Sequence, residues 1–268
     1  MTIWLNGRML PATEARIDPA DRGFTLGDGL FETIRIKDGA PRHLPRHLAR
    51  LTAGADLLRL PLPYDIAALS EAMAALVAAT GLKDGVLRLT LSRGTGARGV
   101  LPPADARPTA MMTVAPAAHM TAPVAAVIAR STRRNEHSPL SRLKSLNYLD
   151  SILARQEAAE RGADEALLLN CAGRLAESSI ASLFLSVGGR LLTPPTADGA
   201  LPGIRRALIL ERHGAEEAPL TPDDFARADE AILTNSLGLR PLLSVDGNPV
   251  GNGTAGPVLA RLLADPDL

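Results

Sequence analysis

The sequence predicts a mixed α/β (α+β) protein with two domains, and three observations lead to this fold class. Strand and helix patterns follow one another along the 268 residues without the strict order of a single doubly wound sheet. The length corresponds to about 1.8 domains of ordinary size. The chain is 46% hydrophobic and 22% charged, with a mean hydropathy of +0.08, which is typical of a folded protein and excludes disordered, collagen-like and coiled-coil chains.

An N-terminal domain is predicted over residues 1–116, followed by a Pro-containing linker over 117–123. Alternating apolar residues indicate strands, and apolar residues three and four apart indicate helices. The expected strands are 2–5, 30–37, 86–92 and 109–114, and the expected helices are 43–60 and 66–79. Asp38-Gly39 is a hairpin signal after the second strand, and Gly81 marks the end of the second helix.

A C-terminal domain is predicted over residues 124–268, and its elements follow from the same patterns. The expected strands are 124–129, 165–169, 174–176, 183–187, 190–193 and 231–234, with a hairpin in 242–249, and the expected helices are 146–161 and 204–213. Turn residues at 170–173 and Gly188-Gly189 separate neighbouring strands, and Gly162 ends the first helix.

Composition and charge exclude several classes of function. The 29 basic and 29 acidic residues balance and aromatic residues make up 3%, so a nucleic acid would find neither an attracting field nor a stacking surface. The single cysteine, Cys171, forms no internal disulfide and, with five scattered histidines, no recognisable zinc site. The start MTIWLNGRML lacks a signal-peptide pattern, and no apolar run approaches the ~18 to 20 residues of a membrane span. We expect a cytoplasmic protein with no nucleic-acid, membrane or metal partner.

Lysine is rare, and its positions are informative. Of the 29 basic residues three are lysines, which leaves 26 arginines. Lys37 and Lys83 each precede Asp-Gly, so we interpret them as exposed turn residues. Lys144, in RLKSLNYLD, has no such turn role. Because lysine, unlike arginine, can lose its proton near neutral pH and attack a carbonyl, Lys144 is the candidate nucleophile, with a chance surface lysine as the alternative.

Two short motifs suggest rival chemistry. Gly94, Gly96 and Gly99 match the G-x-G-x-x-G of an NAD-dependent oxidoreductase, but prolines follow where a helix should begin and no acidic residue closes a second strand. The S-x-x-K at 141–144 matches penicillin-recognising acyl transferases, but no later lysine supplies their Lys-Thr-Gly. We keep the oxidoreductase as a remote alternative and set the acyl transferase aside.

A lysine that acts as an amine nucleophile needs an electrophile that stays bound to the protein. Pyridoxal 5'-phosphate is an electrophile of this kind. Such a site also needs an anion site for phosphate, an acid for the pyridine nitrogen and a cation for the substrate carboxylate. Gly203-Ile204 begins a helix whose N–H groups can bind phosphate, and Thr234-Asn235-Ser236 offers further contacts. Glu177 lies in an otherwise apolar strand region, where a carboxylate needs a cationic partner. Each feature also has a structural reading, as a helix start, a polar strand end or an edge-strand charge.

Several motifs, taken in order over nearly the whole chain, resemble the class IV aminotransferases, the family of branched-chain and D-amino-acid aminotransferases and aminodeoxychorismate lyases. They are DRGFTLGDGLFETIR, HLPRHLARL, RGTGARG, KSLNYLDSILARQEAAERGADEALLLN, GRLAESSIASLF, LPGIR and TNSLGLRPL. The resemblance implies the two-domain architecture of fold type IV, with the N-terminal domain the smaller, a homodimer, and pyridoxal 5'-phosphate as cofactor.

The resemblance also implies roles for individual residues. Lys144 is the Schiff-base lysine, and Glu177 is the partner of the pyridine nitrogen. The other implied cofactor contacts are Arg50, Gly203, Ile204, Asn235 and Ser236 at the phosphate, Leu201 at the ring and Tyr148 at the phenolic oxygen, and the implied substrate contacts are Phe31 and Arg98. Some positions depart from the family pattern, namely Arg205 for threonine, Ser182 for asparagine, Phe31 for tyrosine, Val100 for the histidine of D-amino-acid enzymes, and a Lys144-to-Tyr148 spacing one residue shorter.

We therefore predict an enzyme that moves an amino group between an amino acid and a 2-oxo acid by a ping-pong mechanism through a lysine aldimine. The amino acid is expected to be branched-chain, apolar or of the D series. The alternative within the fold is 4-amino-4-deoxychorismate lyase, which releases 4-aminobenzoate and pyruvate, and RGTGARG and RRNEHSPLSRLKSLN are as typical of it. A cofactor-binding relative without turnover is a third possibility, against which the intact Lys144 argues.

Overall fold

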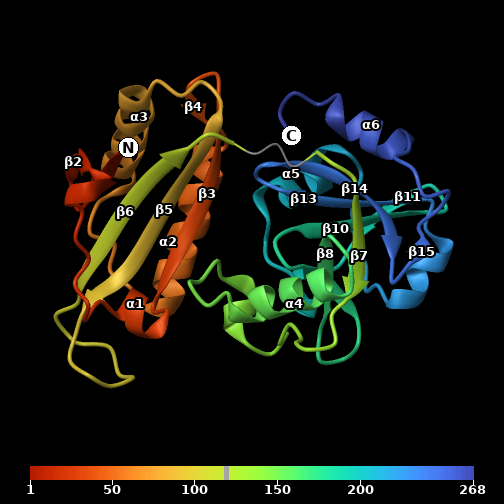
Figure 1. Cartoon of the computed structure of the whole chain (residues 1–268), viewed down its shortest axis with the longest axis horizontal. Helices are drawn as coiled ribbons and strands as arrows, with labels where there is room; N and C mark the ends of the chain where they lie inside the picture. Colours follow the sequence, from red (N-terminus) through yellow and green to blue (C-terminus); the bar gives the residue numbers. More distant parts are fainter. Residues whose placement is uncertain (118–120) are drawn as a thin grey trace. The chain divides into compact units, whose positions relative to one another are not determined.

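The computed structural model describes residues 1–117 and 121–268, and their contacts divide the chain into two compact units (Figure 1). The first unit comprises Met1–Ala118 and Lys144–Asn147, and the second comprises His119–Leu143 and Tyr148–Leu268. The predicted boundaries place Lys144 in the C-terminal domain over 124–268, whereas its contacts place it in the first unit. Residues 118–120 of the predicted linker lie outside the described residues.

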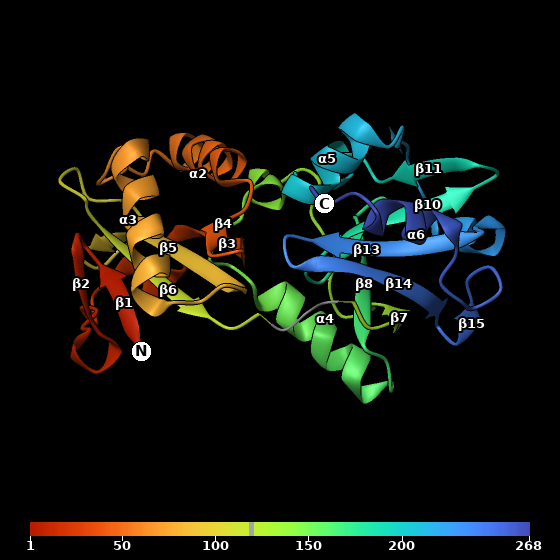
Figure 2. The ribbon, with the colours of Figure 1, turned by 90° about the horizontal axis from the view of Figure 1, so that it is seen from above.

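The first unit is built on a six-stranded antiparallel sheet with the order β2-β1-β6-β5-β3-β4. The strands are β1 (Thr2–Leu5), β2 (Arg8–Pro11), β3 (Gly29–Lys37), β4 (Ala40–Pro41), β5 (Gly85–Thr95) and β6 (Arg107–Ala115). The helices are α1 (Arg22–Leu26), α2 (Leu44–Leu58) and α3 (Ile66–Thr80), with a 3-10 turn at Ala12–Glu14. Helices α2 and α3 pack on the sheet, as Figure 2 shows.

The two faces of this sheet differ because successive strand residues point to opposite sides. On β3, the even-numbered residues from Leu30 to Ile36 are buried on the side that α2 covers. Phe31 and Thr33 point to the other side, where they lie opposite Thr90 and Arg88 of β5. The first face is therefore the core of the unit, and the second is a more polar and more exposed surface.

The second unit is built on a larger sheet with the order β12-β11-β10-β13-β14-β7-β8-β9, and β15 pairs with β14. Its strands are β7 (Val124–Ile128), β8 (Glu165–Leu169), β9 (Leu175–Ser178), β10 (Ser182–Val187), β11 (Arg190–Thr193), β12 (Glu216–Glu217), β13 (Glu230–Asn235), β14 (Gly238–Val245) and β15 (Asn248–Pro249). Its helices are α4 (Leu149–Glu160), α5 (Ile204–Arg212) and α6 (Pro257–Leu263), with 3-10 turns at Pro139–Arg142, Thr196–Asp198 and Pro222–Arg227.

The main core of the second unit lies inside this sheet. One apolar cluster joins Leu175 of β9, at one end of the strand order, to Leu192 of β11, near the other end, so the sheet curls around its own core. A second cluster packs α5 and α6 against β10 and β13. A third sets Ala154 and Ala158 of α4 against β7 and β8, where two methyl groups allow a close approach of the helix.

The predicted elements occur within a few residues of their expected bounds, with one informative exception. The helix expected over 146–161 begins only at Leu149, because Leu146 is hydrogen-bonded to Gly29 beside β3. Helix α6 was not expected, since its start is fixed by a distant side chain: the Glu230 carboxylate accepts N–H groups from residues 256, 258 and 259. No helix in the described part of the chain is long and apolar enough to cross a membrane.

Candidate active site

The segment that carries Lys144 is fixed to the start of β3. The Phe31 N–H donates to the Lys144 carbonyl at 2.9 Å, and the Leu146 N–H donates to the Gly29 carbonyl at 3.0 Å. Gly29 permits this approach, because a Cβ there would lie 2.3 Å from the Leu91 carbonyl oxygen and 2.8 Å from the Leu146 side chain. The Lys144 Nζ lies 4.4 Å from the centroid of the Phe31 ring. The structure thus brings together the predicted nucleophile and a predicted substrate contact.

On the opposite face of β3, the predicted phosphate contact Arg50 belongs to a buried charge cluster. Arg50 donates from Nε and Nη2 to the two oxygens of Glu32 at 2.8 and 2.6 Å, and His47 Nδ1 lies 2.7 Å from the same carboxylate. Burial would raise the pKa of the Glu32 carboxyl, but Arg50 and His47 outweigh it and hold this pKa below its usual value. Burial lowers the pKa of His47, so its ring is neutral at pH 7 and donates its Nδ1 proton to Glu32. The phosphate role of Arg50 stays a prediction.

Arg98, the predicted contact for the substrate carboxylate, lies exposed in the loop between β5 and β6. Buried Arg22 holds this loop by donating from Nη1 and Nη2 to the carbonyls of residues 99 and 100, each at 2.8 Å. Arg22 and Arg93 in turn share the Asp28 carboxylate at 2.8 Å. Burial opposes ionisation of Asp28, but the two arginines prevail and lower its pKa. No contact among the described residues links Arg98 to Lys144.

In the second unit, Glu177 on β9 is held by a cation that sequence reasoning missed. Arg134 Nε lies 3.1 Å from Glu177 Oε1, and the Leu201 N–H donates to Oε2 at 3.0 Å. Arg134 also donates to the carbonyls of Ser141 and Gly199, so the guanidinium joins three parts of the unit. Glu177 is therefore a carboxylate held in place by two donors, one of them the backbone N–H of Leu201, another predicted site residue.

The predicted phosphate site is the N-terminus of α5. Its N-cap, Gly203, has no side chain to cap the helix, which leaves the first-turn N–H groups to other acceptors. A Cβ at Gly203 would lie 2.8 Å from Ser182 Oγ, so any residue other than glycine at this N-cap would require Ser182 to move. Ile204, which follows, is buried. The local geometry fits a bound anion.

Arg205 connects the two halves of this predicted phosphate site. Its Nη2 lies 3.5 Å from the Ser236 carbonyl, at the limit of a hydrogen bond, while its backbone belongs to the first turn of α5. Asn235 is fixed by its Nδ2, which donates to the Ile180 carbonyl, and by its Oδ1, which accepts from the Leu237 N–H. Tyr148 is the N-cap residue of α4.

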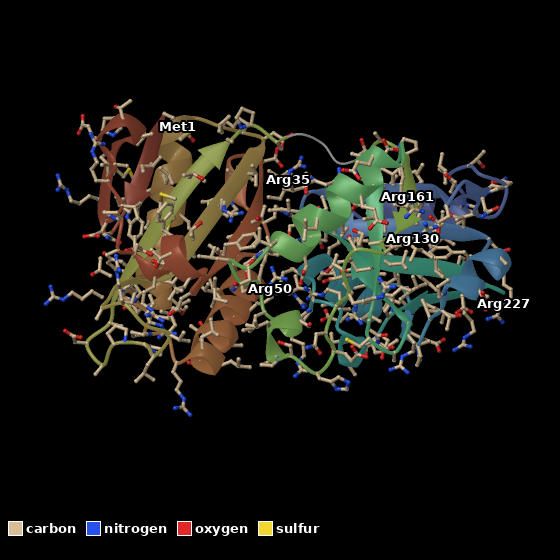
Figure 3. The ribbon with its side chains drawn as sticks, turned by 60° about the horizontal axis from the view of Figure 1, so that its bottom comes forward. Met1, Arg35, Arg50, Arg130, Arg161 and Arg227 are labelled. Carbon is tan, nitrogen blue, oxygen red and sulfur yellow. The ribbon has the colours of Figure 1, made fainter. Side chains whose placement is uncertain are left out.

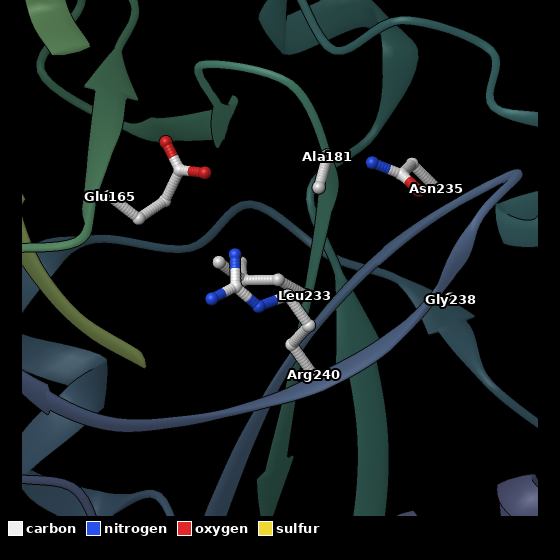
Figure 4. Close-up of a pocket in the computed structure, with 6 residues that line it drawn as sticks. All are labelled: Glu165, Ala181, Leu233, Asn235, Gly238 and Arg240. Atoms are coloured by element: carbon white, nitrogen blue, oxygen red, sulfur yellow. The ribbon is translucent and has the colours of Figure 1, made fainter. Parts of the chain in front are cut away.

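A small hollow lies beside Asn235, and Figure 4 shows the residues around it. Its lining comprises Glu165, Ala181, Leu233, Asn235, Gly238 and Arg240. The space is too narrow for a water molecule. The Glu165 carboxylate at its edge is already bound by Arg155 and Ser179. We assign the hollow to packing and not to cofactor binding.

The amino-transferase class IV family model matches residues 29–245. The D-alanine aminotransferase of Bacillus licheniformis is 30% identical over 270 residues, which span 96% of this chain and 93% of that protein. The structure of branched-chain amino acid aminotransferase from Escherichia coli is similar with a TM-score of 0.92 at 28% identity, covering 98% of this chain and 92% of that one. That of 4-amino-4-deoxychorismate lyase from Pseudomonas aeruginosa is similar with a TM-score of 0.85 at 36% identity, covering 99% and 100%. The chain therefore belongs to the amino-transferase class IV family, which confirms the predicted family, mixed α/β fold, enzymatic nature and cofactor.

Proposed function

We propose that the chain transfers an amino group between an α-amino acid and a 2-oxo acid with pyridoxal 5'-phosphate as cofactor. The observation that carries the proposal is the position of Lys144. Its segment is hydrogen-bonded to β3, and its side chain lies against the ring of Phe31. A similar branched-chain aminotransferase structure contains pyridoxamine 5'-phosphate. When bound, pyridoxal phosphate supplies an aldehyde that bonds covalently to an amine and a ring that withdraws electrons from it.

The residues present fit this group. The open N-cap at Gly203 and the N–H of Ile204 are suited to the phosphate, with Asn235, Ser236 and Arg50 as the further contacts that we propose. Glu177, paired with Arg134, is suited to a protonated pyridine nitrogen. Leu201 and Tyr148 are the proposed contacts of the ring and its phenolic oxygen.

In this proposal Lys144 has two tasks. Its amine holds the cofactor until the substrate amine displaces it, and the freed amine then moves the proton of the substrate α-carbon. Phe31 limits the positions that the Lys144 Nζ can reach, because its ring lies beside the side chain. Arg98 is the proposed contact of the substrate α-carboxylate.

A stopped-flow experiment tests transamination. Purified holoenzyme is mixed with single L- or D-amino acids, without a 2-oxo acid, and release of the matching 2-oxo acid is measured in one turnover. A ping-pong enzyme releases one equivalent per site and then stops. Continued turnover without a 2-oxo acid acceptor, or no release from any amino acid, would contradict transamination.

One observation favours a second candidate, 4-amino-4-deoxychorismate lyase. The lyase structure from Pseudomonas aeruginosa matches this chain end to end at 36% identity. Both reactions would use the same proton removal by Lys144, but a lyase completes its turnover without a 2-oxo acid, whereas a transaminase needs one. Rapid release of 4-aminobenzoate and pyruvate from aminodeoxychorismate, with no half-reaction from amino acids, would assign the lyase.

We also propose that the protein is a cytoplasmic homodimer. The resemblance of the sequence motifs supports the dimer, and the single exposed Cys171 is compatible with a reducing compartment. Light scattering coupled to gel filtration tests the first statement, and fractionation of the source cells tests the second.

A further inference from the structure

Two neighbouring arginines are buried in the first turn of α5. Arg205 is 9% exposed and Arg206 is 4% exposed. The N-terminus of a helix carries about half a positive charge, so a cation buried there is destabilised unless an anion compensates it. The chain therefore places two buried positive charges where the helix itself disfavours them, and each needs an explanation.

For Arg206 the structure contains the compensating anion. Its Nη2 contacts the Glu217 carboxylate of β12 and donates to the Pro194 carbonyl at 2.8 Å. Arg206 thus links α5 to β12 and to the residue after β11. We assign it a structural role in the second unit.

Arg205 extends toward the predicted phosphate site instead. The acceptor of its Nη2 is the Ser236 carbonyl at 3.5 Å, a neutral group that does not offset the charge of the guanidinium. Its Nε, like that of Arg206, is buried without a hydrogen-bond partner in the described part of the chain. The N-cap Gly203 leaves the first-turn N–H groups of the same helix uncapped. A buried cation with an unused donor and uncapped helix N–H groups thus lie at one place, an arrangement suited to an anion with several acceptor oxygens.

The charge of a phosphate also requires more than the other proposed contacts supply. A phosphate monoester carries about 1.5 to 2 negative charges at pH 7. Arg50, which Figure 3 labels, already donates from Nε and Nη2 to the buried Glu32 carboxylate, which compensates much of its charge. The helix N-terminus contributes only about half a charge. A phosphate bound at Gly203 therefore calls for another cation, and Arg205 is a buried arginine two residues further along.

We propose that the Arg205 guanidinium binds the phosphate of pyridoxal 5'-phosphate and supplies the positive charge that balances it. This rests on the proposed function, because it takes Gly203 and Ile204 as the phosphate site. The family pattern has threonine at position 205, which offers one neutral hydroxyl. A guanidinium offers a full charge and planar N–H donors for charge-assisted hydrogen bonds to phosphate oxygens. In this chain the cofactor phosphate is thus held by charge where the pattern would hold it by a hydroxyl.

The consequence concerns retention of the cofactor. When the cofactor carries the amino group, it has no covalent bond to Lys144, and noncovalent contacts alone keep it on the protein. The phosphate is the same in both forms of the cofactor. Arg205 therefore acts throughout the cycle, and its effect is greatest in the form that Lys144 does not hold.

The test compares two ligands that differ by the phosphate, pyridoxamine 5'-phosphate and pyridoxamine. Neither has an aldehyde, so neither bonds covalently to Lys144. Their dissociation constants are measured by calorimetry on the full-length apoprotein of the wild type, Arg205→Met, Arg205→Lys and the control Arg261→Met, which changes an exposed arginine of α6 in the same unit. We expect Arg205→Met to reduce the preference for the phosphorylated ligand about 10- to 100-fold. Arg205→Lys should keep part of the preference, and Arg261→Met all of it.

Two results would overturn the proposal. One is an equal preference in wild type and Arg205→Met, and the other is an equal loss of affinity for both ligands, which would mean that Arg205 only maintains the shape of the site. Arg205→Thr, the residue of the family pattern, takes the place of the methionine variant if that variant does not fold, and a reduced preference is expected again. No turnover is measured, so a wild type that transfers no amino group would refute the proposed transaminase and leave these constants unaffected. A wild type that binds the two ligands alike would refute the phosphate site itself, and the role of Arg205 with it.

Discussion

Arg134 and Glu177 form an ion pair across the second unit, with the arginine Nε 3.1 Å from the carboxylate Oε1. The two side chains are 19% and 11% exposed, so solvent screens the pair only in part. Because Arg134 also binds the carbonyls of Ser141 and Gly199, it holds the Glu177 carboxylate in place. In the proposed function, Glu177 therefore meets the pyridine nitrogen of the cofactor from a fixed position.

Arg134 acts in the proposed site only through Glu177. Its removal should therefore lower the activity by leaving Glu177 less firmly positioned. We expect Arg134→Met to lower kcat about 10- to 100-fold, since a hydrogen bond to a charged group contributes about 1.5–3 kcal/mol. Arg134→Lys should recover part of the activity, and the nearby exposed Arg130→Met should behave as wild type. The rate of cofactor loss on dialysis provides a second readout. Wild-type kcat and retention in Arg134→Met would contradict the positioning role.

Lys144 should be the point of covalent attachment. We expect borohydride to fix the cofactor to the wild type and to Lys83→Ala, but not to Lys144→Ala or Lys144→Arg, and both Lys144 variants to lose nearly all turnover. Lys37 and Lys83 are exposed and lie at turns, so they serve as internal controls. Peptide mapping by mass spectrometry identifies the modified residue. Modification at Lys37 or Lys83 would overturn the assignment.

The Glu32 cluster should make stability depend on pH. Arg50 and His47 lower the pKa of the Glu32 carboxyl below 4.5. The stabilisation that the ionised carboxylate gives the fold is therefore complete above pH 4.5 and is lost as the pH falls through the lowered pKa. We expect Glu32→Gln to destabilise the protein by about 3 kcal/mol at pH 7, because it removes the carboxylate from a buried ion pair with Arg50. The difference in urea midpoint between wild type and Glu32→Gln should shrink between pH 6 and pH 3. A difference that grows on acidification would refute this account.

Arg22 should control the loop that carries Arg98. A lysine there cannot donate to two carbonyls and to Asp28 with one planar group, so we expect faster deuterium uptake in residues 96–101 of Arg22→Lys. We also expect about a 10-fold higher KM with little change in kcat, because Arg98 is the proposed contact of the α-carboxylate. Arg8→Lys is the matched control. Unchanged uptake would show that Arg22 does not hold the loop.

Much of the fold could be predicted because its signals are local. The alternation in GLFETIRIK and the spacing of apolar residues in α2 indicated their elements directly. The same alternation contained an unused signal: Glu32 occupies an inward position among Leu30, Ile34 and Ile36, where a carboxylate needs a buried cation. His47 and Arg50, on the buried side of α2, were available to supply that pairing.

Other features had no local signal. Arg134 lies in an irregular segment of the chain, and its link to Glu177 depends on how distant loops come together. The start of the helix after Lys144 could not be predicted either, because Leu146 is held by Gly29 and not by helical neighbours. The contact of Arg88 on β5 with the Phe31 ring on β3 likewise required the register between the two strands.

The grouping of Lys144–Asn147 with the first unit means that neither unit corresponds to one continuous stretch of the gene. The chain passes from one unit to the other at residues 118–119, 143–144 and 147–148. A recombination event that replaced residues 1–118 as a block would place the β3 of a relative beside the unchanged segment Lys144–Asn147. The hydrogen bonds from Phe31 and to Gly29 use only backbone atoms, so the segment can dock on a foreign strand that keeps a glycine at position 29, while the other side chains around it change. Shuffling of N-terminal units among relatives is therefore a route by which substrate preference could change while the nucleophile stays in place.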